Sequence, residues 1–268
     1  MESIDTISKK YLILMRHGER IDENVEEKCN QKLHCKDPEL TKRGYQLSKE
    51  MGTKIMNFLN QITNIETLNK SLTIEDFMFV TSPFSRAIQT AKGVVHSIIN
   101  PENDQESFYS QYGKFIKVEN LFAESYTTKY HSGYIFKDFV SLYQNADNGS
   151  SIFEAFEGEK LHFYNFSTSN PLENLPTEYE DELADVERRM IAGLKVNFEE
   201  FKNCKVLVIV SHATPIEVMF NSLIEDKELH IDHKFINYCE SFLLQRADNG
   251  SISNCTFINK LSIDINSI

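Results

Sequence analysis

The sequence is short of positive charge, and this shortage limits the partners that it can bind. Its 28 Lys and Arg residues stand against 40 Asp and Glu residues, which gives a formal net charge of −12 at pH 7. Most of such a surface would repel a nucleic acid or an anionic membrane. We therefore expect no nucleic-acid partner and no membrane partner, and any basic site must be local.

The sequence also lacks the patterns typical of secretion and of membrane insertion. No apolar run approaches the length that spans a bilayer, and the opening residues 1–5 lack the positive-then-apolar order of a signal peptide. The five cysteines are odd in number and include no Cys-x-x-Cys pair. Together these absences predict a reducing, cytoplasmic setting.

No internal repeat and no linker divides the chain, so we expect residues 1–268 to form a single domain. Strand-like apolar runs alternate with helical spacing, which predicts an α/β fold. The expected architecture is a three-layer sandwich, with a mostly parallel central sheet and helices on both faces. Residues 125–176 follow no clean period and are rich in Tyr, Phe, Ser, Asn and Gly, so we expect an inserted cap segment there.

Four continuous apolar runs predict buried strands, and a C-terminal pair of runs predicts a hairpin. These strands are expected at residues 11–15, 77–80, 115–118, 206–210, 241–247 and 251–258. Helical spacing of apolar residues predicts three helices. They are expected to begin after Thr41 as the cap residue, near Phe84, and at residue 177.

Charged or polar segments follow three of the predicted strands directly. Arg16-His17-Gly18-Glu19-Arg20 follows the first strand, and Ser211-His212-Ala213 follows the fourth. Thr81-Ser82-Pro83 leads from the second strand into a helix whose first turn carries Arg86. Because open α/β folds bind ligands at the carboxyl ends of their strands, we expect these segments to meet in one site.

The residue types in these segments are suited to phosphate chemistry. A histidine attacks phosphorus when its reactive nitrogen is unprotonated and the phosphoryl charge is neutralised. Arginines serve both needs, because they bind phosphate oxygens and disfavour the imidazolium form. Arg16 and Arg20 flank His17, and Arg86 comes from a helix start whose amides also favour an anion. His212 can donate a hydrogen bond to a phosphoryl oxygen.

Taken together, these residues resemble the histidine phosphatase superfamily, also called the phosphoglycerate-mutase-like family. The matching segments occur in family order: Arg16-His17-Gly18, Leu40-Thr41-x-x-Gly44, Thr81-Ser82-Pro83-x-x-Arg86-x-x-Gln89-Thr90-Ala91, Glu124 and Ser211-His212. Within the superfamily, the segments around His17 and His212 are most similar to the TULA/Sts protein tyrosine phosphatases and the ecdysteroid-phosphate phosphatases.

The resemblance implies a role for each matching residue. His17 is the nucleophile that becomes phosphohistidine, and Glu124 is the acid that protonates the leaving oxygen. The phosphate pocket comprises Arg16, Arg20, Arg86 and His212, and His212 also counts among the catalytic residues. We expect no cofactor and no metal, because Cys29, His34 and Cys35 are not matched by a second ligand pair with zinc spacing. Glu119, five residues before Glu124, is the alternative acid.

The favoured function is a phosphomonoester hydrolase whose substrate is a phosphorylated small molecule or a phosphoprotein. Six Tyr and Phe residues between 126 and 143 suggest an apolar wall for phosphotyrosine or another aryl or lipophilic phosphate, although they also suit a small core of the insertion itself. A non-catalytic family member within a larger assembly is one alternative. A phosphoglycerate mutase is the lesser alternative, because the mutase-type motif places Asn where this chain has Glu23. The oligomeric state, homodimer or larger assembly, stays open.

Overall fold

The computed structural model describes residues 10–22, 38–67, 72–99, 115–124, 183–246 and 252–258. The strands and α-helices follow the order β1 (Lys10–Arg16), α2 (Lys42–Thr67), β2 (Phe77–Thr81), α3 (Ser85–Ile99), β3 (Ile116–Val118), α6 (Leu183–Glu200), β4 (Val206–Ser211), α7 (Ala213–Leu223), β5 (Ser241–Arg246) and β6 (Ile252–Phe257). Four 3₁₀ turns are η1 (Ile74–Asp76), η4 (Asn120–Phe122), η7 (Lys227–Leu229) and η8 (His233–Phe235).

Within these residues, the strands form one six-stranded sheet in the order β3-β2-β4-β1-β5-β6. The first four strands in that order are parallel to one another, whereas β5 runs antiparallel to β1 and β6 antiparallel to β5. Arg16 lies opposite Ser211, and Thr81 lies opposite Val210. The carboxyl ends of β1, β2 and β4 therefore meet at one edge of the sheet.

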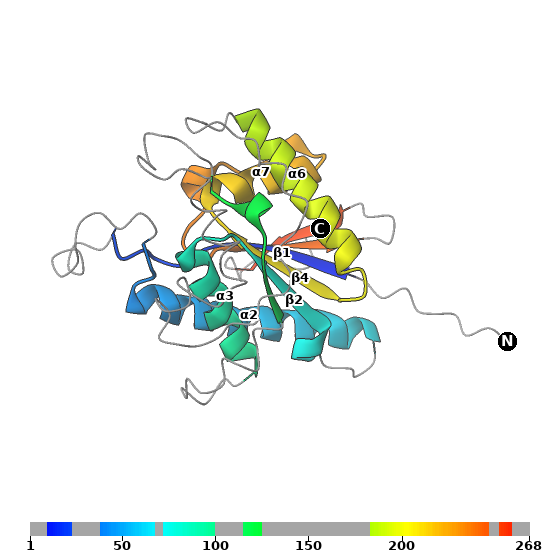
Figure 1. The fold of residues 1–268 in the computed structure, drawn as a ribbon. Helices are drawn as coiled ribbons and strands as arrows, with labels where there is room; N and C mark the ends of the chain where they lie inside the picture. The colour runs from blue at the N-terminus through cyan, green and yellow to red at the C-terminus, as the bar shows by residue number, and fades with distance from the viewer. Residues whose placement is uncertain are drawn as a thin grey trace.

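Helices cover both faces of the sheet, with α2 and α3 on one side and α6 and α7 on the other (Figure 1). Successive residues of β1 serve the two faces in turn, as the two-residue period of a strand requires. Ile13 and Met15 pack in the core under α2 and α3, whereas Leu12 and Leu14 pack in the core under α6 and α7. A strand buried on both faces is apolar throughout.

The α/β class, the mostly parallel sheet and the helices on both faces are thus confirmed. The six predicted strands are present, and their described ends differ from the predicted ones by at most one residue. The helix predicted from residue 177 is described from Leu183 onward. The predicted cap over 125–176 lies outside the described residues, and the single-domain organisation stays a prediction.

The loop after β1 lies directly against the start of α2. Thr41 is the cap residue as predicted, since its Oγ1 accepts the N–H of Gly44 at 2.8 Å. A Cβ atom on Gly44 would lie 2.4 Å from the carbonyl oxygen of Glu19, and one on Gly18 would lie 2.7 Å from the carbonyl oxygen of Gly44. Both glycines are needed for this approach, which anchors the segment that carries His17.

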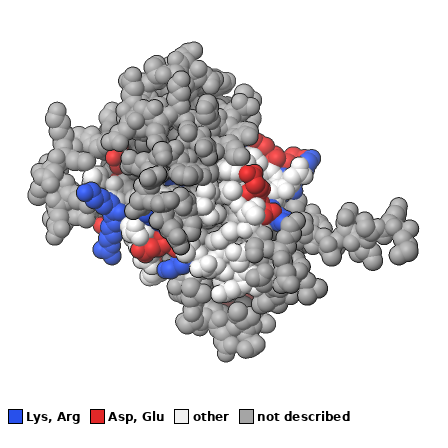
Figure 2. Space-filling model, turned by 90° about the horizontal axis from the view of Figure 1, so that it is seen from below, with Lys and Arg blue, Asp and Glu red and all other residues white. Residues whose placement is uncertain are grey.

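The surface shown in Figure 2 mixes both signs of charge among its described residues. Groups of Lys and Arg lie near groups of Asp and Glu, with uncharged residues between them. Across the described part of the chain, none of the helices combines the length and the apolar character that a bilayer crossing requires.

Candidate active site

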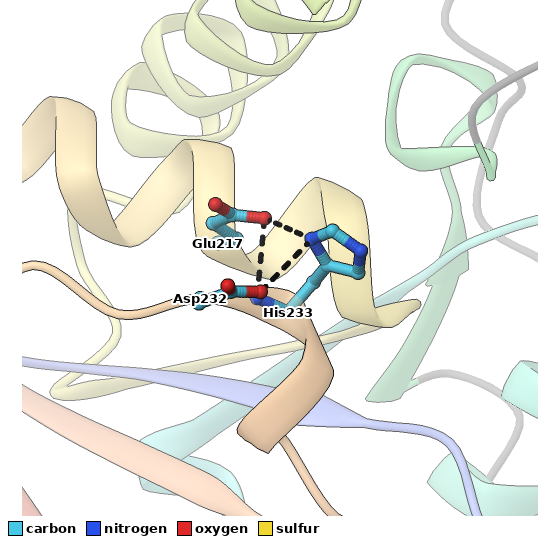
Figure 3. A group of neighbouring side chains, drawn as sticks. All are labelled: Glu217, Asp232 and His233. Atoms are coloured by element: carbon cyan, nitrogen blue, oxygen red, sulfur yellow. Dashed lines mark hydrogen bonds and ion pairs between the residues drawn. The ribbon is translucent and has the colours of Figure 1, made fainter.

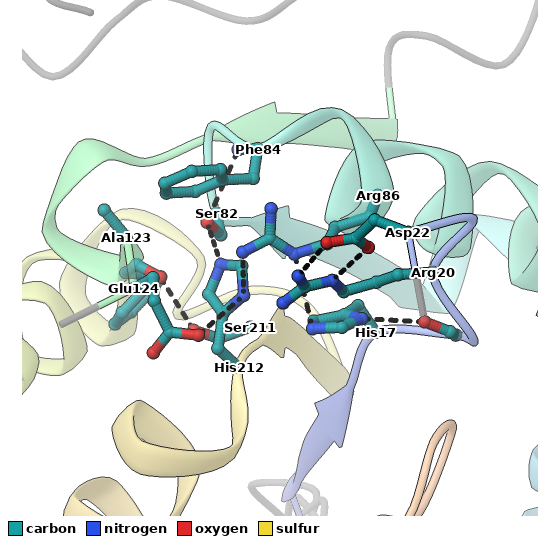
Figure 4. A network of polar contacts seen from close by, with 12 residues as sticks. His17, Arg20, Asp22, Ser82, Phe84, Arg86, Ala123, Glu124, Ser211 and His212 are labelled. Atoms are coloured by element: carbon teal, nitrogen blue, oxygen red, sulfur yellow. Dashed lines mark hydrogen bonds and ion pairs between the residues drawn. The ribbon is translucent and has the colours of Figure 1, made fainter. Parts of the chain in front are cut away.

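The functional side chains continue from the ends of three adjacent strands. The N–H of His17 donates to the carbonyl oxygen of Ser211 at 2.9 Å, and the N–H of Ser82 donates to that of Val210 at 2.9 Å. The backbone pairing of the sheet thus extends one residue past β1 and β2. This extension brings His17, Ser82 and His212 together, as Figure 4 shows.

The geometry of His17 determines which of its ring nitrogens is free to react. Nδ1 lies 2.7 Å from the carbonyl oxygen of Gly18. Because a carbonyl only accepts, Nδ1 carries the proton and Nε2 keeps its lone pair. Arg86 agrees with this assignment, since its Nε donates toward His17 Nε2 at 3.4 Å.

The surroundings of His17 also keep its ring uncharged. Its side chain is only 1% exposed. Burial is the main cause that holds the pKa of His17 well below its ordinary value, and the positive charges of Arg86, Arg16 and Arg20 act in the same direction. The Gly18 carbonyl favours the charged ring but does not reverse the shift. Nε2 is therefore an unprotonated nitrogen beside arginines.

Arg86 links the two histidines from the first turn of α3. Its Nη2 lies 3.1 Å from His212 Nδ1, while its Nε faces His17. The guanidinium is almost fully buried and its Cζ lies 4.3 Å from the centre of the Phe84 ring. Thr90, one turn further along α3, accepts the Gly18 N–H at 2.9 Å and donates to the Arg86 carbonyl at 2.7 Å. Helix α3 thus holds the loop that carries His17 as well as the arginine.

His212 is fully buried at the cap position of α7. Its Nε2 lies 2.8 Å from Ser82 Oγ. Because Arg86 can only donate to Nδ1, Nε2 carries the proton and donates to Ser82. The ring stands edge-on to Phe84 at 5.0 Å and to His17 at 5.0 Å between ring centres. These contacts fix the orientation of the His212 ring next to His17.

Arg20 forms a bidentate ion pair with Asp22, a residue that we did not predict for the site. Arg20 Nε donates to Asp22 Oδ1 at 2.9 Å, and Nη2 donates to Oδ2. Burial alone would raise the pKa of Asp22, but the hydrogen bonds and charge of Arg20 hold it below its ordinary value. Asp22 therefore stays ionised and orients Arg20 beside the pocket, where Figure 4 places both above His17.

Arg16 directly precedes His17 but contacts the segment that precedes β5. Its Nη1 donates to the carbonyl oxygen of Ile236 at 2.5 Å, and its Cζ lies 4.3 Å from the centre of the Tyr238 ring. The Tyr238 ring in turn lies 5.8 Å from the His17 ring. Arg16 thus contributes charge to the site. Its guanidinium also packs against Tyr238, whose ring lies at the edge of the site.

The backbone of that segment is hydrogen-bonded to the end of β1 at two further points. Cys239 N–H donates to the His17 carbonyl at 3.3 Å, and Arg16 N–H donates to the Glu240 carbonyl at 3.1 Å. Cys239 has φ of 57°, in the left-handed region, which turns the chain at this point. Burial raises the pKa of the Cys239 thiol to about 12, so this cysteine stays a neutral thiol.

Glu124 approaches His212 from the side away from His17, as Figure 4 shows. Its Oε2 lies 3.3 Å from His212 Nδ1, and its side chain is 19% exposed. The structure thus brings Glu124 into the group predicted from the sequence. Partial exposure leaves the carboxyl group accessible to solvent.

Glu119, the alternative acid, points into a different environment. Its side chain is 1% exposed, and its Oε2 lies 3.5 Å from Lys117 Nζ. Its Oε1 accepts the N–H of Leu121 at 3.1 Å. Lys117 also contacts Asn197 and Glu200 of α6. Glu119 therefore belongs to a buried charged network under the loop and does not reach His212.

A second cluster of acidic and imidazole groups lies between α7 and η8 (Figure 3). His233 Nδ1 lies 2.6 Å from Glu217 Oε2 and 3.4 Å from Asp232 Oδ1. Both oxygens already accept backbone N–H groups, from His233 at 3.2 Å and from Lys234 at 2.9 Å. These bonds explain the cluster as a tether that holds η8 on α7.

Three residues near the site were missed from the sequence. Asp22, Tyr238 and Arg189 were assigned no role, although Asp22 stands only two residues after Arg20. Tyr238 lies in a segment without periodicity. Arg189 had one detectable signal, because it stands four and eight residues before Gly193 and Asn197 on a predicted helix.

The comparisons with known proteins give the fold. No protein-family model and no curated protein matches the sequence. Among solved structures, the chain resembles a phosphoglycerate mutase from Bacillus anthracis str. Sterne, with 14% identity over 92% of this chain and 91% of that one and a TM-score of 0.51. At this identity the likeness shows a phosphoglycerate-mutase-like fold, which agrees with the resemblance stated from the sequence.

Two phosphatases are among the other matching structures. An ecdysone phosphate phosphatase from Bombix mori in complex with tungstate has 16% identity, covers 91% of this chain and 92% of its own, and has a TM-score of 0.48. A phosphoserine phosphatase from Entamoeba histolytica in complex with 3-phosphoglyceric acid has 20% identity, covers 92% and 96%, and has a TM-score of 0.46.

Proposed function

We propose that the chain is a phosphomonoester hydrolase that works through a phosphohistidine formed on His17. The observation that carries this proposal is the state of that ring. Nδ1 is engaged with the Gly18 carbonyl, so the unprotonated Nε2 is left beside the guanidinium of Arg86. A buried, neutral imidazole among arginines is the arrangement that nucleophilic attack on an anionic phosphoryl group requires.

In the first step, the Nε2 lone pair of His17 attacks phosphorus and the ester P–O bond breaks. Glu124 gives its proton to the departing oxygen, which leaves as an alcohol or a phenol. The arginines bind the oxygens of the transferring phosphoryl group. His212 accepts from Arg86 at Nδ1 and holds that guanidinium in place. In the second step, water attacks phosphorus, the P–N bond breaks, and the proton lost by water returns to Glu124. Inorganic phosphate is released and both residues regain their starting states.

We expect an aryl phosphate to be the preferred class of substrate. Tyr238 supports this preference, because its half-buried ring lies 5.8 Å from the His17 ring at the edge of the site. The phenyl group of an ester whose phosphorus faces His17 Nε2 can pack against such a ring. Phosphotyrosine in a phosphoprotein and a small aromatic phosphate share this chemistry.

The proposed route uses no metal ion and no cofactor. The positive charge that a metal would supply comes from Arg86, Arg20 and Arg16, all of which act on His17 electrostatically. We therefore expect EDTA to leave the rate of p-nitrophenyl phosphate hydrolysis unchanged. Loss of activity in EDTA that a divalent cation restores would contradict this part of the proposal.

The test compares wild-type protein with His17→Ala on a panel of phosphotyrosine peptides, steroid phosphates, nucleotides, sugar phosphates and p-nitrophenyl phosphate. We expect His17→Ala to lower turnover by on the order of 10³-fold or more, because the covalent route loses its nucleophile. The matched control is His230→Ala, since His230 is exposed and lies outside the site. It should retain the wild-type rate.

Other outcomes would favour the alternatives. Conversion of 2-phosphoglycerate with a bisphosphoglycerate primer, faster than any hydrolysis, would indicate a mutase. Binding of phosphate esters without turnover of any of them would indicate a non-catalytic subunit. Residual activity of His17→Ala near the wild-type rate would contradict the proposed mechanism itself.

A further inference from the structure

One face of α6 is built against the segment that carries Glu124. Arg189, Gly193 and Asn197 are spaced by four residues, which places them above one another on a helix. Each of them contacts the chain between residues 117 and 124. This row, which we call the α6 stripe, lies beside the apolar residues Val186, Met190 and Leu194 that bury α6 in the core.

Arg189 makes the most specific contacts of the α6 stripe. Its Nη1 donates to the carbonyl oxygens of Leu121 and Ala123, each at 3.0 Å. Its Nη2 donates to the carbonyl oxygen of Glu124 at 3.2 Å. The residue is 6% exposed. One buried guanidinium thus fixes three carbonyl groups at the end of the segment, including that of Glu124 itself.

The rest of the segment is held from two sides. A Cβ atom on Gly193 would lie 2.7 Å from Cε1 of Phe122, so the helix approaches the Phe122 ring closely. On the opposite side, Ser211 Oγ donates to the Phe122 carbonyl at 2.7 Å. Ser211 directly precedes His212. The segment that carries Glu124 is therefore held both by α6 and by Ser211, the neighbour of the histidine that the Glu124 carboxylate contacts.

We propose that Arg189 is a positioning residue that sets the place of Glu124 relative to His212 and the leaving oxygen. The proposal rests on the proposed function, in which Glu124 is the general acid. A guanidinium is a rigid planar fork with five donors, so it can hold several carbonyls in one arrangement. A lysine at this position keeps the charge but has neither the reach nor the fork. Loss of the fork displaces the acid while His17, Arg86 and Thr90 stay in place.

The test measures leaving-group dependence. Wild-type protein, Arg189→Lys and Arg189→Gln are assayed on p-nitrophenyl phosphate, whose leaving group needs little protonation, and on phenyl phosphate, which depends on the acid. The ratio measured is kcat/KM for p-nitrophenyl phosphate divided by kcat/KM for phenyl phosphate. We expect this ratio to rise by about 10- to 100-fold in both variants, since a displacement near 1 Å can cost about 10² in rate. The inhibition constant for vanadate should change by a smaller factor than this ratio. That result would show, in the same preparation, that the phosphate site is folded. Arg188→Lys is the matched control, because Arg188 is the exposed neighbour on α6.

A second arm separates positioning from general weakening of the fold. In the Glu124→Gln background, Arg189→Lys should produce no further rise of the ratio, because the acid is already absent. Equal slowing on both substrates, or a further rise of the ratio in that background, would overturn the proposal for Arg189. If Glu124→Gln itself slows both substrates equally in an active enzyme, the proposed acid is wrong and the proposal falls with it.

Discussion

At the end of β1, His17 continues the backbone pairing of the sheet, whereas Glu124, beyond β3, is held by side chains. His17 donates its N–H to the Ser211 carbonyl as one more rung of the parallel ladder. The carbonyl of Glu124 instead accepts from Arg189, a residue 65 positions away in the sequence. His17, the proposed nucleophile, is thus placed by strand register, and Glu124, the proposed acid, by a tertiary contact.

This difference has consequences for robustness. Strand register depends on many hydrogen bonds and on apolar residues of both cores, and Thr90 adds one bond to the Gly18 N–H. The place of His17 therefore does not depend on one side chain alone. The place of Glu124 depends on a few donors, chiefly Arg189 and Ser211. We therefore expect single substitutions around the acid to alter catalysis selectively, and substitutions around β1 to act mainly through stability.

The largest effect that sharpens this comparison comes from the two glutamates of the β3 segment. Glu124→Gln should slow phenyl phosphate by about 10²- to 10⁴-fold and p-nitrophenyl phosphate much less, because only the poorer leaving group requires a proton. Glu119→Gln should lower the free energy of unfolding instead, because it removes a charge from the buried contact with Lys117. Steady-state kinetics on both substrates and urea unfolding of both variants make the measurement.

The opposite assignment would give the reverse pattern. If Glu119→Gln shows the leaving-group dependence and Glu124→Gln slows both substrates equally, Glu119 is the acid. The contrast drawn between the placement of His17 and that of the acid would then be wrong. The acid would lie in the buried network of Lys117 and Asn197.

A smaller effect tests the burial of His17 through the pH dependence of stability. The pKa of His17 is lowered in the folded protein, chiefly by burial, and is close to 6.5 when the chain is unfolded. Below that pH the unfolded chain takes up a proton that the folded protein does not. The free energy of unfolding should therefore fall as pH decreases below 6.5, by up to about 1.4 kcal/mol per pH unit from this group.

Urea unfolding of wild-type protein and His17→Gln at several pH values between 7 and 5 isolates this contribution. The variant should lose less stability over that interval, since glutamine does not titrate. Parallel pH profiles for the two proteins would show that His17 titrates alike when folded and unfolded, and would contradict the buried neutral ring.

The parts of the site that the sequence revealed are those placed by strands. Continuous apolar runs predict strands buried on both faces, and polar residues directly after them must lie at the carboxyl edge of a parallel sheet. His17, Ser82 and His212 could be found in this way. Arg86 could be found because it follows β2 by a short turn at the start of α3.

The parts that the sequence did not reveal depend on contacts between elements far apart in the chain. The spacing of Arg189, Gly193 and Asn197 marks one face of a helix, but it does not reveal that the Arg189 guanidinium reaches the carbonyls of residues 121–124. Arg16 was expected in the phosphate pocket, and its bond to Ile236 and its contact with Tyr238 depend on a segment without helical or strand period. The aromatic wall expected in 125–176 lies outside the described residues.

The most direct test of the central claim is to locate the phosphoryl group on the enzyme during turnover. Wild-type protein is mixed with p-nitrophenyl phosphate and quenched in alkali, because a phosphohistidine is labile in acid. The modified residue and the bonded nitrogen are then identified by mass spectrometry and by phosphorus and nitrogen NMR. We predict phosphorus on Nε2 of His17, since Nδ1 is engaged with the Gly18 carbonyl. Phosphorus on Nδ1, phosphorus on another residue, or turnover without any covalent phosphate would contradict the account.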